Sequence, residues 1–355
     1  MRVVLKIGSS SLTDELGHIA EHAIVKLCDE LAHARANGHE LLVVSSGAVA
    51  AGMPAVGLTQ RPRDPLTLQA ISAVGQSRLM EVYNRALWSH GLVAGQVLIS
   101  PHDFFDRTQY LHAKATLGRL LELGVVPVLN ENDALADTEL RFGDNDRIAA
   151  LVAHLVGADV LVLLTDITGV FTSDPRLDAS ASLIEEIQEV DRALQAAAGG
   201  AGTSRGSGGM ASKLAAARIA AWSGVRTVIA AASRADVVAD AIEGRNGVGT
   251  IVAPRQRRMA ARKLWIAFAL GAEGTVVVDD GARRALEDRG TSLLPVGVVS
   301  VHGHFESGSA VEVASLDGTV FAKGLARVGA VDLAALAGKR GPAAVIHRDE
   351  LVLVP

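Results

Sequence analysis

The chain has 355 residues, of which 49% are hydrophobic, and a formal net charge of −5. This length exceeds what one hydrophobic core usually serves, which predicts two domains, and the apolar runs are too short to cross a bilayer. Cys28 is the only cysteine, which excludes an internal disulfide, and the first residues, MRVVLKIG, lack the features of a secretory signal, so we expect a cytoplasmic protein without a membrane segment.

Short β-branched runs alternate with longer Ala- and Leu-rich stretches from residue 3 to about residue 252. The run VVLKI is followed by HAIVKLCDELAHARANG and then by LLVVSS, and further strands are expected at 92–99, 125–130, 160–165 and 227–231. Several of these runs are apolar without alternation, as strands buried on both faces are. The pattern predicts an α/β domain over residues 1–254, in which helices sandwich an open, mostly parallel sheet.

The pattern changes after Pro254. The basic stretch RQRRMAARK opens a predicted linker at 255–270. Short runs separated by Gly, Asp and Ser follow it, including GTVVVDD, GVVSVHG, SAVEVAS, GTVFAKGLARV and ELVLV. Residues 271–355 are therefore predicted to form a small β-rich domain.

Polar residues gather where the predicted strands of the first domain end. Lys6 lies near the end of the first strand, Ser45-Ser46-Gly47 follow the second, and later strands end in Asn130-Glu131-Asn132-Asp133 and Thr165-Asp166. The carboxyl ends of parallel strands line one edge of a sheet, and ligands bind in the crevice outside that edge. One such cluster alone is usual in turns and helix caps, but four of them predict a shared pocket.

Two lysines are candidates for binding phosphate. On a central strand, with Gly8 allowing a ligand close to the backbone, Lys6 would clamp a phosphate, whereas on an edge strand it would be structural. The segment GTSRGSGGMASK places Lys213 in the first turn of a helix predicted to begin near Ala211, and helix N-termini bind phosphate. Considered alone, the Gly-rich stretch at 196–209 is also compatible with a flexible linker.

Sequence motifs for other chemistries are missing. There is no H-E-x-x-H, the 11 histidines are scattered, and Gly206-Ser207-Gly208 lacks the frame of a hydrolase elbow. The Gly-rich loop does not end as a Walker A loop does, and its match to G-x-G-x-x-A follows no strand. The sequence assigns no metal ligands, and it predicts chemistry by charge handling instead of nucleophilic attack by a side chain.

Taken together and in order, the segments KIGSS, VVSSGAVAAG, VLNENDA, GDND, LLTDITGV and GSGGMASK resemble the amino acid kinase superfamily. The resemblance covers essentially the whole chain and is strongest to the members that phosphorylate the γ-carboxylate of L-glutamate with ATP, the first step of proline synthesis. The tail, with RGTSLLPVGVVSVHGHF, resembles the PUA domain that many bacterial members carry. The resemblance therefore implies the amino acid kinase fold followed by a PUA-like domain.

The resemblance also implies roles for individual residues. Lys6 and Lys213 would contact the transferring phosphoryl group, and Asp146 would orient both lysines. Glutamate would be held by Ser46, Asp133 and Asn145, while Asp144 would contact the substrate ammonium or a hydrated metal. ATP, with Mg²⁺, would be held by Lys6, Gly8, Thr165, Asp166, Ser207, Gly208, Gly209, Met210, Ala211, Ser212 and Lys213.

The stretch RFGDNDR at 141–147 precedes a predicted helix, so its acidic and amide residues are also candidates for simple N-capping.

A carboxylate with a pKa of about 4.3 is already ionised at neutral pH, so an attacking glutamate needs no general base. The obstacle is repulsion between two anions, which lysines, Mg²⁺ and backbone amides would reduce. This predicts in-line phosphoryl transfer supported by positioning and neutralisation of charge.

Several expectations about partners follow from the resemblance. They are feedback inhibition by proline, a reductase that consumes γ-glutamyl phosphate, and a homo-oligomer, either dimer or tetramer. The apolar helix expected around 70–79 would supply the face between subunits or would be buried within the subunit.

Two alternatives stay open, namely a different small carboxylate, carbamate or phosphorylated acceptor on the same fold, and RNA binding through the tail. Residues 256–355 hold 12 Lys and Arg against 11 Asp and Glu, so RNA binding is not favoured.

Overall fold

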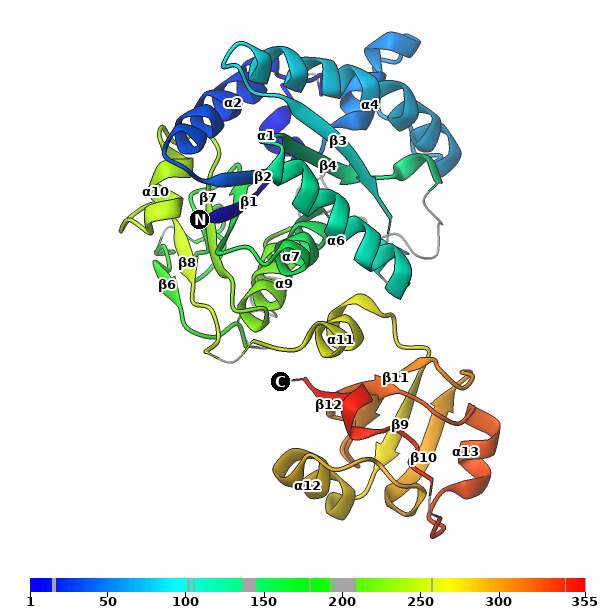
Figure 1. Ribbon diagram of the computed structural model, residues 1–355. Coiled ribbons are helices and arrows are strands. Elements are labelled where there is room, and N and C mark those ends of the chain that lie inside the picture. Colours follow the sequence, from blue (N-terminus) through cyan, green and yellow to red (C-terminus); the bar gives the residue numbers. More distant parts are fainter. Residues whose placement is uncertain are drawn as a thin grey trace. The chain divides into compact units, whose positions relative to one another are not determined.

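The computed structural model describes residues 1–14, 17–100, 103–104, 106–135, 145–178, 180–191, 194, 209–256, 258–341 and 343–354. It divides into two compact units, Met1–Arg258 and Met259–Pro355, each with its own sheet (Figure 1). Within the described residues, no helix combines the length and the apolar character needed to cross a membrane.

The first unit is built on an eight-stranded sheet with the order β3-β4-β2-β1-β5-β7-β8-β6. All neighbouring pairs are parallel except β7 and β8. The prediction of a mostly parallel sheet is therefore confirmed. The strands are β1 Arg2–Ile7, β2 Glu40–Val44, β3 Ala94–Ile99, β4 Val126–Glu131, β5 Val160–Thr165, β6 Glu186–Ile187, β7 Arg226–Ala231 and β8 Thr250–Val252.

Strand β1 is central, with β2 on one side and β5 on the other, and Lys6 aligns with Val44 and Leu163 in these neighbours. The chain runs outward through β2 and then returns to the other side of β1, so the strand order reverses at β1. Such a reversal opens a crevice at the carboxyl ends of the strands. Every residue of β4 and β5 is buried, and apart from Asn130, Glu131 and Thr165 at their carboxyl ends both strands are apolar, as strands buried on both faces are.

Helices cover both faces of this sheet (Figure 1). Helices α2, α4 and α10 pack on the face that carries Val3, Leu5 and Ile7, whereas α7 and α9 pack against each other on the opposite face. Side chains alternate between the faces of a strand, so Lys6 belongs to the α7 face. The helices are α1 Ser9–Leu12, α2 Glu21–Ala36, α3 Ala48–Gly52, α4 Pro65–Trp88, α6 Arg107–Glu122, α7 Asn145–Val156, α9 Met210–Trp222 and α10 Val237–Glu243, with short 3₁₀ turns at Pro54–Val56 and Asp133–Leu135.

Helix α4 begins with standard capping chemistry, because the side chain of Asp64 accepts a hydrogen bond from Thr67 N at 2.8 Å and Pro65 occupies the first turn. Further along, α4 touches α3 through two glycines. A Cβ added to Gly75 would lie 1.8 Å from the carbonyl oxygen of Ala48, and one added to Gly52 would lie 2.2 Å from that of Ile71. Only glycine allows these backbones to approach so closely.

The second unit contains a five-stranded sheet with the order β10-β9-β11-β12-β13, in which β9 and β11 are parallel and the other pairs antiparallel. Each strand falls within a run predicted from the sequence. Residues 259–270, within the stretch predicted as a linker, include helical turns from which Ile266 packs beside Val352. The elements are α11 Ala261–Leu264, the π-helical turn Trp265–Ala269, β9 Gly274–Val278, α12 Asp280–Arg289, the 3₁₀ turn Pro295–Gly297, β10 Val298–Gly303, β11 Ala310–Ala314, β12 Val320–Leu325, α13 Ala330–Leu336, the 3₁₀ turn Arg348–Glu350 and β13 Leu351–Leu353.

Candidate functional site

The candidate active site centres on one carboxylate that joins two lysines. Asp146 Oδ1 lies 2.6 Å from Lys6 Nζ, and Asp146 Oδ2 lies 3.1 Å from Lys213 Nζ. The hydroxyl of Ser212 also donates to Asp146 Oδ2, at 3.1 Å. Lysines 207 positions apart in the chain are thus held together in the first unit.

Local structure explains this convergence. Lys6 is the penultimate residue of β1 and points to the α7 face, Asp146 is in the first turn of α7, and Lys213 is in the first turn of α9. Helix α9 begins at Met210, one residue before the predicted start, with Gly209 as its N-cap. A carboxylate in the first turn of a helix is stabilised by the helix dipole, so the N-terminus of α7 suits Asp146.

The three charged groups are buried together. Asp146 is 0% exposed, and the exposed fractions of Lys6 and Lys213 are 5% and 6%. Burial acts to raise the pKa of Asp146, but the ammonium groups of Lys6 and Lys213 outweigh it, and the pKa lies below its ordinary value. Asp146 is therefore an ionised carboxylate that pairs with cations and is unsuited to accept a proton at neutral pH.

The backbone at Gly8 lies beside this cluster. A Cβ added to Gly8 would lie 3.4 Å from Lys6 Nζ, so the glycine keeps a side chain out of contact with the ammonium group. Short side chains and a helix N-terminus beside two lysines form the kind of site that binds phosphate groups.

A second cluster, of amide and hydroxyl groups, surrounds Asn145, the residue before Asp146. Asn145 precedes Asp146, and its Nδ2 lies within hydrogen-bond distance of the carbonyl oxygen of Ser45 at 3.0 Å, Ser46 Oγ at 2.9 Å and Asn130 Oδ1 at 3.1 Å. The ends of β2 and β4 and the start of α7 therefore meet at one side chain. The structure thus brings the predicted residues Ser46 and Asn145 into contact.

Helix α4 forms one side of this cluster. Gln76 Oε1 accepts a hydrogen bond from Asn130 Nδ2 at 2.9 Å, and Ser72 Oγ, one turn earlier, donates to Asp133 Oδ2 at 2.8 Å. Neither Ser72 nor Gln76 was among the residues predicted from the sequence. Both lie in a largely apolar helix, and two polar residues four positions apart were the signal that could have identified them.

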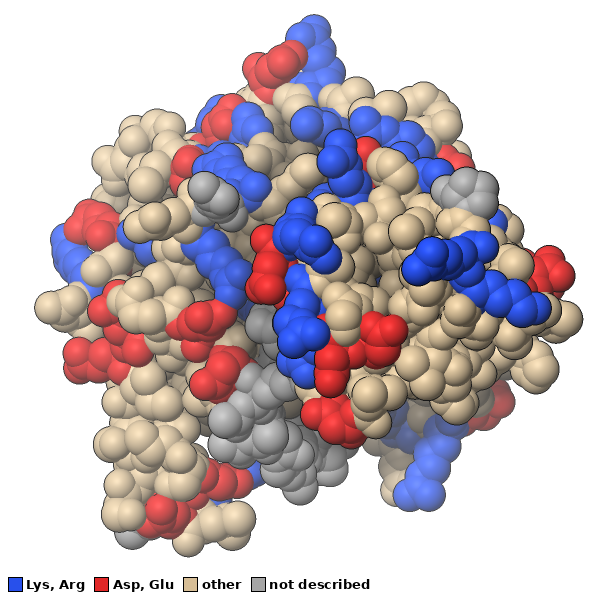
Figure 2. Space-filling model, turned by 90° about the horizontal axis from the view of Figure 1, so that it is seen from below, with Lys and Arg blue, Asp and Glu red and all other residues tan. Residues whose placement is uncertain are grey.

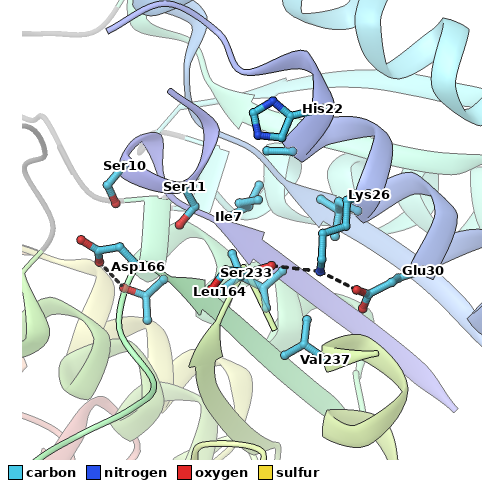
Figure 3. A pocket seen from close by; sticks show the side chains of 14 residues that line it. Ile7, Ser10, Ser11, His22, Lys26, Glu30, Leu164, Asp166, Ser233 and Val237 are labelled. Carbon is cyan, nitrogen blue, oxygen red and sulfur yellow. Dashed lines mark hydrogen bonds and ion pairs between the residues drawn. The ribbon is translucent and has the colours of Figure 1, made fainter. Parts of the chain in front are cut away.

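Thr165 and Asp166 lie at the end of β5, where Thr165 Oγ1 donates to Asp166 Oδ1 at 3.0 Å. They line a cavity of about 420 Å³ on the α2 face of the sheet, together with Ser10, Ser11 and Ser233 (Figure 3). Lys26 closes part of its wall, with Nζ 2.6 Å from Glu30 Oε1. The lysine pair and this cavity lie on opposite faces of the sheet and share its carboxyl edge.

Of the other predicted site residues, Gly209, Met210 and Ala211 lie at the start of α9 next to Ser212 and Lys213. Asp144, Ser207 and Gly208 lie outside the described residues. Among the described residues, no three His, Cys, Asp or Glu side chains are grouped so that they could hold a metal ion.

A doubly wound fold with a buried pair of lysines at its carboxyl edge is an arrangement suited to binding phosphate groups. Comparison with known proteins identifies the class of protein to which the chain belongs. The chain belongs to the amino acid kinase family, whose sequence pattern matches residues 1–231, and the PUA domain pattern matches residues 274–348. The expected kinase fold and PUA-like tail are confirmed.

The relatives narrow the class to one enzyme. Glutamate 5-kinase of Pelobacter propionicus is 42% identical over 99% of this chain and 97% of its own, and glutamate 5-kinase of Pseudomonas entomophila is 44% identical over 99% and 98%. Among solved structures, carbamate kinase from Giardia lamblia bound to AMP-PNP matches with a TM-score of 0.52 and 16% identity, covering 71% of this chain and 98% of its own. That likeness supports the fold alone.

Proposed function

We propose that this protein transfers the γ-phosphoryl group of ATP to the γ-carboxylate of L-glutamate, giving γ-glutamyl phosphate and ADP in the first step of proline synthesis. The names of its relatives support this reaction. The observation that carries the proposal is the bridging of Lys6 and Lys213 by Asp146 at the crevice of the sheet. Two fixed ammonium groups reduce the repulsion between the carboxylate and the phosphoryl group, two anions that must approach each other.

In this proposal the chain supplies charge and position and no general base. The γ-carboxylate of glutamate is ionised at neutral pH, so it attacks without losing a proton. Lys6 and Lys213 neutralise the oxygens of the transferring group, and Asp146 holds both ammonium groups in place through its two carboxylate oxygens.

The same proposal assigns ATP to the edge formed by Gly8, Thr165, Asp166 and the start of α9. Mg²⁺ in kinases is usually bound by phosphate oxygens, water and one or two carboxylates. The oxygens of the triphosphate would supply ligands to such an ion. When bound, it would add positive charge at the phosphate oxygens.

Glutamate is assigned to the amide cluster, where Ser46, Asn145 and Asp133 supply hydroxyl, amide and carboxylate groups. A polar pocket with both donors and acceptors suits an amino acid zwitterion. Proline as a feedback inhibitor, a reductase that consumes the acyl phosphate, and assembly into a dimer or tetramer complete the proposal.

The deciding experiment is a hydroxamate assay with ATP and Mg²⁺, because hydroxylamine traps acyl phosphates. We expect product with glutamate and little with aspartate or N-acetylglutamate. Product with a different acceptor alone would refute glutamate as the substrate and leave only the assignment to the kinase class.

Basic and acidic side chains are interspersed on the face shown in Figure 2, which gives no support to RNA as the main ligand.

A further inference from the structure

The orientation of the side-chain amides in the second cluster is fixed by the backbone. The N–H of Glu131 can only donate, and it lies 2.9 Å from Asn130 Oδ1, so that atom of Asn130 is the acceptor oxygen. Asn130 Nδ2 must then donate to Gln76, which turns Gln76 Oε1 toward it. The amide nitrogen of Gln76 therefore points away from Asn130.

The same reasoning fixes Asn145. Its Nδ2 faces the carbonyl oxygen of Ser45, which only accepts, so Asn145 Oδ1 points elsewhere. The chain of hydrogen bonds from Gln76 through Asn130 to Asn145 thus has two open ends. Gln76 Nε2 and Asn145 Oδ1 are both buried, and within the described residues neither makes a hydrogen bond.

Open polar atoms of this kind are costly in a folded protein. A buried donor without a partner costs free energy on the order of 1–3 kcal/mol, so native structures satisfy nearly all of them with protein, water or ligand. Gln76 is 8% exposed, and its helix also contacts Asp133 through Ser72. The uncompensated donor therefore lies beside the residues to which the proposed function assigns glutamate.

We propose that Gln76 binds the substrate directly, its Nε2 donating a hydrogen bond to the α-carboxylate of glutamate. The two open ends match a zwitterion, because a carboxylate accepts from Gln76 Nε2 and an ammonium group donates to Asn145 Oδ1. The α-carboxylate is the one assigned, since the γ-carboxylate must face the lysine pair. Gln76 is two hydrogen bonds away from Asn145 and lies on α4, whereas Lys6 lies on β1 and Lys213 on α9.

This inference rests on the proposed function and is tested with Gln76→Leu and Gln76→Glu. Gln76→Leu removes the side-chain amide. Gln76→Glu keeps an oxygen that accepts from Asn130, but it replaces the donating nitrogen with an oxygen that repels the substrate carboxylate. We expect the glutamate KM to rise roughly 10- to 100-fold in both, as for loss of a hydrogen bond to a charged group. The turnover number and the ATP KM should stay within a few-fold, and Gln96→Leu, an exposed glutamine on β3, should match the unmodified enzyme.

Three other results would overturn the inference. An unchanged KM in both variants would exclude a substrate contact, and a normal KM in Gln76→Glu alone would mean that Gln76 acts only by supporting Asn130. If Gln76→Leu folds poorly, the thermal shift produced by glutamate in Gln76→Glu decides, and a shift equal to that of the unmodified protein would count against the contact. Absence of γ-glutamyl hydroxamate from the unmodified enzyme would instead refute the proposed function itself.

Discussion

Replacing Asp146 by Asn tests the central electrostatic feature of the fold. The substitution keeps the shape of the side chain but removes the negative charge that the two lysines share, at a position that is 0% exposed. Breaking a buried ion pair by neutralising one partner costs about 3–5 kcal/mol, because the remaining charge stays buried without compensation. For a unit of this size we expect the unfolding midpoint to fall by roughly 6–20 °C.

The assay is thermal unfolding with and without ATP and Mg²⁺. Nucleotide phosphates would supply the missing negative charge, so ATP should raise the midpoint of Asp146→Asn by more than that of the unmodified protein. The matched control is Glu122→Gln, which breaks an exposed pair with Arg119 at 2.9 Å and should change stability by less than about 1 kcal/mol. Equal midpoints for Asp146→Asn and the control would refute the idea that Asp146 compensates two buried charges.

The remaining predictions concern single side chains. Lys213→Ala should lower turnover by about 100-fold or more while the unfolding transition persists, and near-normal turnover would contradict the phosphate role. In Asn145→Ala and Asp133→Ala the KM for glutamate should rise strongly with the KM for ATP little changed, and the reverse pattern would mean that the two substrate sites are exchanged. Burial, followed by the charges of Lys114 and Arg258, lowers the pKa of His154 to about 4, so the folded state resists protonation there. Stability should therefore be full above the unfolded pKa of about 6.5 and decline as the pH falls toward 4, by at most about 3 kcal/mol, and denaturant titrations of His154→Gln should show a flatter profile over that interval.

Much of the site followed from the positions of polar residues in the sequence. Lys6, Ser46, Asp133 and Thr165 lie at or just after the ends of runs predicted as strands, and the parallel topology brings the strand ends to one edge. The hydrophobic periodicity alone could not predict that Lys6 meets Lys213. That prediction also requires knowing to which face of the sheet Lys6 points and where helix α9 begins. The family resemblance supplied the pairing, and the structure supplies the geometry.

Helix α4 shows what the sequence could not provide. The segment around residues 70–79 looked like an apolar helix that could be buried in the subunit or lie between subunits. The structure buries Ile71 and Leu79 within the first unit and turns Ser72 and Gln76 toward the end of β4. A polar residue in such a helix gains meaning only when the neighbour that it faces is known, and that neighbour is about 60 residues away in sequence.

The contact between Gly52 and Gly75 bears on how the enzyme could be redesigned. Gly75 is adjacent to Gln76, so any larger residue there would push α3 away from α4 and displace the residues to which we assign glutamate. Adaptation to a longer or bulkier carboxylic acid would therefore begin at side chains such as Ser72, with both glycines retained.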